Sequence, residues 1–379
     1  MVTPRAAKRP PRRRRILVTG YPGFIGRRLV ERILASEPDA KLYLLTQEKF
    51  TGRARALLAQ LPASHAARAQ ILQGDIVAMD LGLAGAEYRA LTAEVTDIYH
   101  LAAIFYLGVP AGEARRVNVD GTRQVLDLAR NCRRLQRFNH FSTCYVSGDR
   151  LGVIEEDELD CGQHFRNHYE RTKFQAEQLV QAAASELPVT IFRPSIVVGD
   201  SHTGEIDRFD GIYHIGMLVM ASPVAVPLPL PGEAVAPVNM VPVDFVAAAC
   251  HHISTDPRAI GRTFHIVDPS PLSSRRVFEL FSARSGKRLP RWRLNYRLTR
   301  ALLHVPGLEK LARQPAQALE YLNHLAIYNC PNTLELLDGS GILCPRFETY
   351  ADNLMRYVRR HLKARAASKA LAADDPLDR

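Results

Sequence analysis

Residues 16–26 read ILVTGYPGFIG, and this stretch decides the fold. The apolar run ILVT is typical of a strand buried in a parallel sheet. Apolar residues then recur at helical spacing through residues 29–34. Gly20 permits a tight turn, Gly23 lets the backbone approach a pyrophosphate, and Gly26 permits close packing of helix on strand. The sequence therefore predicts a dinucleotide-binding turn at a helix N-terminus, although glycines that serve packing alone are the alternative.

A second motif, YERTK at residues 169–173, indicates what chemistry takes place beside that turn. Tyr169 and Lys173 are four residues apart on an expected helix, so their side chains share one face. A free tyrosine has a pKa of about 10, and a neighbouring ammonium group lowers that pKa by stabilising the phenolate. We expect Tyr169 to donate a proton to a carbonyl oxygen as hydride reaches the carbonyl carbon. On its own, such a pair is also common on helix surfaces.

Strand and helix patterns alternate through the first 200 residues. Strands are expected at residues 16–19, 41–46, 69–74, 97–102, 138–142 and 189–193, with helices at 118–131 and 169–184. Such alternation predicts an α/β fold with a Rossmann-like, doubly wound parallel sheet. After Gly199 the rhythm breaks, a late strand is expected at 264–267, and residues 294–362 read as mostly helical. This part predicts a smaller, mostly helical C-terminal substrate lobe.

The expected domain organisation follows from these patterns. It comprises a basic disordered tail (1–14), an NAD(P)-binding Rossmann domain (15–200), a substrate-binding lobe (201–365, with 244–268 returning to the Rossmann sheet) and a C-terminal tail (366–379).

The net charge of +11 belongs to two short segments of the 379-residue chain. Residues 1–14 and 355–369 each hold six Lys or Arg and no acid, and the remainder is close to neutral. This distribution argues against nucleic-acid binding. The six cysteines show no CxxC or Cys/His spacing, so we expect no metal site and reduced thiols. No apolar signal-peptide region follows the basic start, which favours a cytoplasmic location.

Two segments leave contact with a membrane open. Residues 211–232 carry no Asp, Glu, Lys or Arg, and four prolines interrupt them. The prolines argue against a spanning helix, so this stretch is either a buried wall of a substrate cleft or a lipid-facing entrance. Residues 354–371 form a basic amphipathic pattern, which is typical of a terminal helix packed on its own domain or of one lying on an anionic membrane. A peripheral membrane location is therefore kept as an alternative.

Seven motifs in order within residues 16–268 resemble the extended short-chain dehydrogenase/reductase family. They are the glycine turn (19–26), Asp75-Ile76, HLAA (100–103), NVDGT (118–122), FSTCYVSG (141–148), YERTK (169–173) and RPSI (193–196). The resemblance implies a catalytic set of Thr143, Tyr169, Lys173 and Asn118, with Ser142 as the alternative to Thr143. Asn118 would fix a water relay behind Lys173, which would also bond the nicotinamide ribose. The implied cofactor contacts are Gly20, Tyr21, Gly23, Phe24, Ile25, Gly26, Asp75, Ile76, Leu101, Ala102, Ala103, Lys173, Pro194, Ser195 and Ile196.

Cofactor choice depends on the end of the second strand. An acid there binds the ribose 2′-OH of NAD, whereas a basic neighbourhood accommodates the 2′-phosphate of NADP. The chain has Thr46 and Gln47 at this point, followed by Glu48, Lys49 and Arg53. NADP(H) is therefore favoured, and Glu48 keeps NAD(H) open.

The segments RPSIVVGDSHTGE (193–205) and VPVDFVA (241–247) resemble the fatty acyl-CoA reductase and thioester-reductase branch, the "male sterility" type. This resemblance implies reduction of an acyl thioester, carried on CoA or an acyl carrier protein, to an aldehyde. The alternative is a dehydrogenase, epimerase or dehydratase that acts on a sugar nucleotide or a sterol-like alcohol or ketone. A protein that binds the dinucleotide without turnover is a third hypothesis. Homodimers are common in the family, and a homodimer is expected as an alternative to a monomer.

Overall fold

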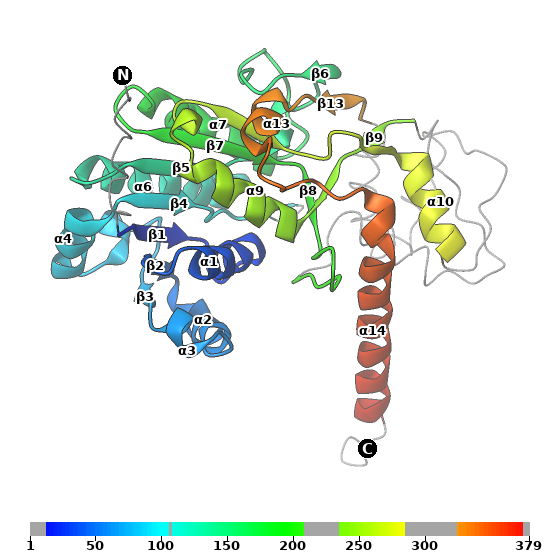
Figure 1. Cartoon of the computed structure of the whole chain (residues 1–379), viewed down its shortest axis with the longest axis horizontal. Coiled ribbons are helices and arrows are strands. Elements are labelled where there is room, and N and C mark those ends of the chain that lie inside the picture. Colours follow the sequence, from blue (N-terminus) through cyan, green and yellow to red (C-terminus); the bar gives the residue numbers. More distant parts are fainter. Residues whose placement is uncertain (1–12, 106–107, 208–234, 285–323, 374–379) are drawn as a thin grey trace, which may run out of the picture.

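A parallel sheet of seven strands forms the centre of the computed structural model, which describes residues 13–105, 108–207, 235–284 and 324–373 (Figure 1). The strand order is β11-β7-β5-β4-β1-β2-β3, and every neighbouring pair is parallel. The strands span Arg15–Thr19 (β1), Lys41–Thr46 (β2), Ala69–Gln73 (β3), Asp97–His100 (β4), Arg137–Phe141 (β5), Val189–Pro194 (β7) and Thr263–Ile266 (β11). The predicted doubly wound sheet is thus confirmed, with strand ends within two residues of those expected.

Helices cover both faces of the sheet, which explains why successive residues of β1 are apolar. Ile16, Leu17 and Val18 of β1 are fully buried. One face packs against α1 and α9, and the other against α4, α6 and α7 (Figure 1). The helices of the sheet layers are α1 (Phe24–Ser36), α2 (Glu48–Leu58), α3 (Ala63–Ala66), α4 (Gly85–Glu94), α5 (Ala111–Arg115), α6 (Gly121–Asn131), α7 (His168–Ala183) and α9 (Val243–Thr255).

The strand order reverses beside β1, whose neighbours are β2 on one side and β4 on the other. In open α/β sheets such a switch point leaves a crevice at the carboxyl ends of the strands, and ligands bind there. The glycine turn follows β1 and the segment of residues 101–103 follows β4, so both lie at this crevice. The fold therefore brings together the glycine turn and residues 101–103, both of which the resemblance gives as cofactor contacts.

A smaller unit follows β7, and its described residues form short strand pairs and three helices. Strands β8 (Ile196–Val198) and β10 (Met240–Pro242) pair in parallel, and β9 (Pro237–Val238) and β12 (Leu272–Ser273) pair antiparallel. The helices are α10 (Ser274–Arg284), α13 (Pro331–Leu337) and α14 (Phe347–Ala373). Aromatic side chains of α10 and α14 form a core of their own, including Phe278, Phe281 and Phe347. Residues 211–232 and 294–323 lie outside the described residues, so the expected cleft wall stays a prediction.

One strand of this unit reaches back over the sheet. β13 (Ala326–Tyr328) pairs in parallel with β6 (Gly152–Ile154), which follows the end of β5. Tyr328 is buried, and its hydroxyl lies 3.3 Å from the Ser147 hydroxyl. This two-stranded ladder therefore covers the turn that leads away from β5.

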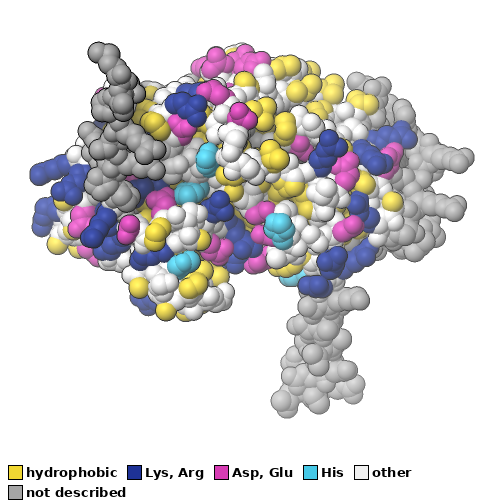
Figure 2. Space-filling model, in the orientation of Figure 1, with side chains coloured by type: hydrophobic (Ala, Val, Ile, Leu, Met, Phe, Trp, Pro, Cys, Tyr) yellow, Lys and Arg dark blue, Asp and Glu magenta, His cyan; other side chains and the backbone are white. Residues whose placement is uncertain are grey.

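The surface charge and the packing of α14 bear on possible nucleic-acid and membrane partners. Basic and acidic side chains are intermixed over the face shown in Figure 2, without a continuous basic stripe. Leu354 and Val358 of α14 are buried against α10, so this part of the helix packs on its own domain. Within the described residues, none of the helices combines the length and apolarity needed to cross a bilayer.

Candidate active site

The glycine turn is packed so tightly that side chains would not fit. Gly20 has a φ of +86°, and a Cβ there would lie 2.8 Å from the Ala102 nitrogen and from the Leu101 carbonyl carbon. A Cβ on Gly23 or Gly26 would lie 2.8 Å from the Gly20 oxygen. The turn therefore needs glycine at all three positions, and the chain leaving β4 passes directly against it.

The N-terminus of α1 has the properties of an anion site. The helix begins at Phe24, its N-cap is Gly23, and no side chain caps it. Backbone N–H groups at such an end point toward a ligand and carry the positive end of the helix dipole. These residues fit a dinucleotide pyrophosphate. Tyr21 is buried, and its hydroxyl donates to the Ala54 carbonyl at 3.4 Å, so within this structure it supports the turn.

Asp75 and Ile76 follow the end of β3, and their expected contact with the adenine side of a cofactor stays a prediction. The Asp75 carboxylate accepts hydrogen bonds from the Gln47 amide at 2.9 Å and from the Val77 backbone at 3.1 Å. Ile76 packs against Gly121, where a Cβ would come within 2.6 Å of the isoleucine Cδ1. The glycine at the start of α6 thus makes room for Ile76, a role that its sequence position alone did not indicate.

Thr143, Tyr169 and Lys173 come together at the end of β5. The Thr143 hydroxyl accepts from the Tyr145 backbone at 3.3 Å and lies beside the Tyr169 hydroxyl, whose pKa it lowers. Lys173, one helical turn after Tyr169, is buried and donates to the Phe141 carbonyl at 2.6 Å. The structure therefore unites three of the four predicted catalytic residues. Their roles in a reaction stay predictions.

Ser142, the alternative to Thr143, has a different partner. Its hydroxyl donates to Glu177, which also holds the guanidinium of Arg193 at 2.6 Å. Both charged side chains are almost completely buried. Since the Ser142 hydroxyl is engaged with Glu177 below the site, the geometry favours Thr143 as the group that meets a carbonyl oxygen.

Burial shifts the two titrating groups in opposite directions. The pKa of Tyr169 is raised because burial disfavours the phenolate, although the neighbouring Thr143 hydroxyl opposes this. The pKa of Lys173 is lowered to about 8 because burial disfavours the ammonium ion, and the charge of Glu177 opposes this. At neutral pH the tyrosine therefore carries its proton and the lysine is mainly charged.

Asn118 holds the backbone after β4 in place. It lies in a π-helical turn, Arg116–Asp120, and is buried. Its side-chain oxygen accepts from the Ile104 nitrogen at 2.8 Å, and its amide nitrogen donates to the Ile104 oxygen at 3.3 Å and to Thr172 at 3.0 Å. The structure thus connects Asn118 to α7 through the neighbour of Lys173. The expected water relay stays a prediction.

The motif of Pro194, Ser195 and Ile196 depends on a residue that the sequence did not reveal. The Ser195 hydroxyl donates to the Asn239 side chain at 2.8 Å, and Asn239 in turn donates to the Asp268 carbonyl at 2.8 Å. Pro194 presents its carbonyl to the Thr143 hydroxyl at 3.5 Å. No local pattern indicated Asn239, because its partners lie more than 25 residues away on either side.

A second residue that the sequence did not reveal is Phe105. Its ring stands edge-on to that of Tyr169, with centroids 4.7 Å apart, and its side chain is half exposed. An apolar ring at this place can contact the part of a substrate next to the reacting carbonyl. In the part of the chain that the structure describes, no three His, Cys, Asp or Glu side chains are grouped as metal ligands.

The fold and this site together define an NAD(P)-dependent oxidoreductase of the extended short-chain dehydrogenase/reductase type. The family model described as "Male sterility protein" matches residues 18–250, which is more than half of the chain. The chain therefore belongs to the male sterility protein family.

Several curated relatives show the range of this similarity. Glycine betaine reductase ATRR of Emericella nidulans is 30% identical over 279 residues, covering 70% of this chain and 22% of the relative. Fatty acyl-CoA reductase wat of Drosophila melanogaster is 27% identical over 236 residues, covering 52% of this chain and 46% of the relative. The alcohol-forming fatty acyl-CoA reductase of Simmondsia chinensis is 29% identical over 192 residues, covering 45% and 39%. The chain thus spans less than half the length of these relatives.

Among solved structures, the terminal R domain from the myxalamid PKS-NRPS biosynthetic pathway superposes with a TM-score of 0.79. It is 28% identical, and the match covers 92% of this chain and 91% of that one. UDP-glucuronic acid 4-epimerase from Bacillus cereus, solved with NAD, has a TM-score of 0.64 at 20% identity, covering 91% of this chain and 99% of that one. The second comparison supports the fold alone.

Proposed function

We propose that this protein is an NADPH-dependent reductase of an acyl thioester or a related lipid-like carbonyl, with Tyr169 as the proton donor. The observation that carries the proposal is the grouping at the end of β5, where Tyr169 lies beside Thr143 and Lys173, one turn further along α7, donates to the Phe141 carbonyl. Relatives named as fatty acyl-CoA reductases, and an R domain of similar structure, support the thioester as substrate. The substrate would be presented on CoA or on an acyl carrier protein.

The residues of the site divide the work of such a reduction. NADPH, when bound, supplies the hydride. Thr143 donates a hydrogen bond to the carbonyl oxygen and holds the carbonyl in place. Tyr169 transfers its proton to the same oxygen, which yields a neutral hemithioacetal whose collapse releases thiol and aldehyde. Lys173, mainly charged at neutral pH, stabilises the tyrosinate that remains.

NADPH is proposed over NADH because of the side chains that follow β2. Lys49 and Arg53 project from α2 as exposed bases. Gln47, at the N-cap of that helix, donates to Asp75. A basic neighbourhood at this strand end suits a 2′-phosphate.

The test is NADPH oxidation with acyl-CoAs of increasing chain length, with simple aldehydes and ketones alongside. A chain-length optimum supports a lipid-like thioester, whereas turnover of simple ketones alone contradicts it. Tyr169→Phe should lower the rate by about 10²–10⁴-fold while cofactor binding persists. Tyr88→Phe is the matched control, because this hydroxyl accepts from Asn131 at the C-terminal end of α6 and forms no hydrogen bond with Thr143 or Lys173 in the part of the chain that the structure describes. Equal rates in both variants would exclude Tyr169 as the proton donor.

A further inference from the structure

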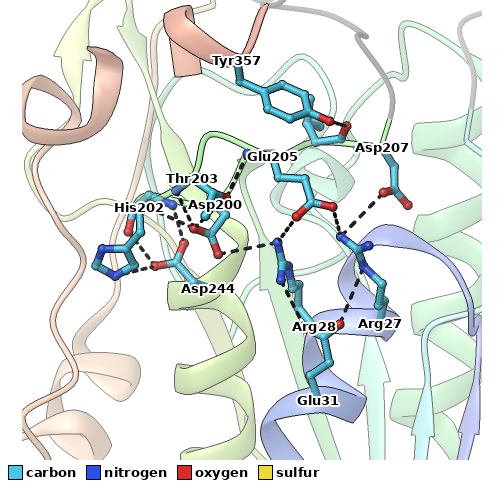
Figure 3. A network of polar contacts seen from close by, with 12 residues as sticks. Arg27, Arg28, Glu31, Asp200, His202, Thr203, Glu205, Asp207, Asp244 and Tyr357 are labelled. Atoms are coloured by element: carbon cyan, nitrogen blue, oxygen red, sulfur yellow. Dashed lines mark hydrogen bonds and ion pairs between the residues drawn. The ribbon is translucent and has the colours of Figure 1, made fainter. Parts of the chain in front are cut away.

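A short acidic segment, residues 200–207, contacts helices of both the nucleotide-binding half of the molecule and the smaller unit (Figure 3). The Glu205 carboxylate accepts from Arg27 at 2.7 Å and from Arg28 at 2.8 Å, and both arginines belong to α1. Asp207 pairs with Arg53 of α2 at 2.7 Å and lies 3.9 Å from Arg27. The segment thus places two carboxylates on the arginines that surround the glycine turn.

The beginning of this segment is fixed independently of Arg53. Asp244 of α9 accepts from the Ser201 nitrogen at 2.8 Å and from its hydroxyl at 2.6 Å. Asn353 of α14 donates to the Ser201 carbonyl at 2.7 Å. Gly204, at a φ of +74°, packs so closely on Asn353 that a Cβ would lie 2.2 Å from its carbonyl oxygen. These contacts hold the segment in place, so Asp207 at its end is presented to α2 by the fold itself.

Arg53 lies near the end of β2, where NADPH would be distinguished from NADH. It is six residues after Gln47, about 9 Å along the helix axis, and Gln47 contacts the adenine-side Asp75. Its side chain is 51% exposed, so a ligand can reach it even with Asp207 in place. A 2′-phosphate at the end of β2 would be attracted to this guanidinium. In the structure, however, a carboxylate already neutralises it.

We propose that Asp207 and the 2′-phosphate of NADPH compete for Arg53, so that Asp207 is a determinant of cofactor choice. The inference rests on the proposed use of NADPH at this turn. Phosphate and carboxylate beside one guanidinium repel each other, so binding of the 2′-phosphate of NADPH to Arg53 is opposed by Asp207. NADH lacks the 2′-phosphate and binds without disturbing the pair. Asp207 therefore weakens the binding of NADPH but not that of NADH, which reduces the preference of the protein for NADPH.

The competition is tested by measuring dissociation constants of NADPH and NADH by cofactor fluorescence, which needs no turnover. Asp207→Asn should tighten NADPH about tenfold and leave NADH within about twofold. Glu205→Gln is the matched control. It removes a carboxylate from the same segment but leaves the ion pair of Arg53 and Asp207 intact. The ratio of its dissociation constants for NADPH and NADH should therefore stay near that of the wild type.

The double variant Arg53→Met/Asp207→Asn separates this inference from the proposed function. If Asp207 acts through Arg53, the gain of Asp207→Asn disappears in the Arg53→Met background. If Asp207→Asn tightens both cofactors equally, or the gain persists without Arg53, the competition is refuted. If Arg53→Met weakens NADPH but Asp207→Asn changes nothing, the competition alone fails. If Arg53→Met leaves NADPH binding unchanged, Arg53 does not bind the 2′-phosphate, and both the competition and this part of the proposed function fail.

Discussion

The buried ion pair of Glu177 and Arg193 provides the sharpest prediction of stability, because its two charges are so well enclosed. Their closest atoms are 2.6 Å apart, and the side chains are 0% and 1% exposed. At an effective dielectric of 20, two unit charges at this distance attract by about 6 kcal/mol. Glu177→Gln keeps the shape of the side chain but removes the charge, and it leaves a guanidinium buried without a counter-ion. We expect unfolding free energy to fall by about 3–5 kcal/mol.

The measurement is urea-induced unfolding of four proteins: wild type, Glu177→Gln, Arg193→Met and the double variant. The double variant should be more stable than the Glu177→Gln single variant, since methionine removes the orphaned charge. Glu186→Gln is the control. It breaks a pair with Arg130 of similar length, 2.9 Å, whose side chains are 61% and 42% exposed, and should cost no more than about 1 kcal/mol. Equal costs for the buried and exposed pairs, or additive effects in the double variant, would refute the reasoning.

Two further predictions concern the glycine turn and acid stability. Gly26→Ala should weaken dinucleotide binding and lower stability, because the new Cβ would lie 2.8 Å from a backbone oxygen. Gly52→Ala in α2 is the control: its Cβ meets nothing within 4 Å, and it should stabilise the protein by about 0.5–1 kcal/mol. Both variants are compared by thermal unfolding and cofactor titration, and equal effects would contradict the packing argument. Burial lowers the pKa of His100 and of His265 to about 3, so the stability from their neutral forms is complete above about pH 6.5 and is lost as the pH falls toward 3, by about 2 kcal/mol each at pH 5. Urea unfolding between pH 7 and 5 measures this loss, and a flat curve would show that these histidines are not buried as described.

Local sequence patterns were sufficient to predict the sheet and the family. Gly20 follows an apolar strand and Gly26 lies in the first turn of an amphipathic helix, and both signals arise within a few residues of chain. The spacing of Tyr169 and Lys173 likewise needs only one helical turn. The doubly wound sheet follows from repetition of such local units, which is why its strand ends were predicted within two residues.

The sequence could not predict the contacts that fix the site from a distance. Asn239 holds Ser195, and Asp207 holds Arg53, yet each pair joins parts of the chain with no shared local pattern. A hydrogen bond or ion pair between distant segments depends on how the loops return, and composition carries no signal for that. The choice between Thr143 and Ser142 was likewise open until the position of Glu177 was known.

The ladder of β6 and β13 has a consequence for the order in which the molecule is made. β13 is synthesised about 170 residues after β6, roughly 9–35 s later at 5–20 residues per second. Until then the turn between Thr143 and β6 lacks the buried Tyr328, which contacts Ser147. The nascent Rossmann half can therefore complete its glycine turn well before the turn that carries Thr143 is covered. During translation, a chain that has emerged only through β11 is expected to bind cofactor before it can carry out the reaction.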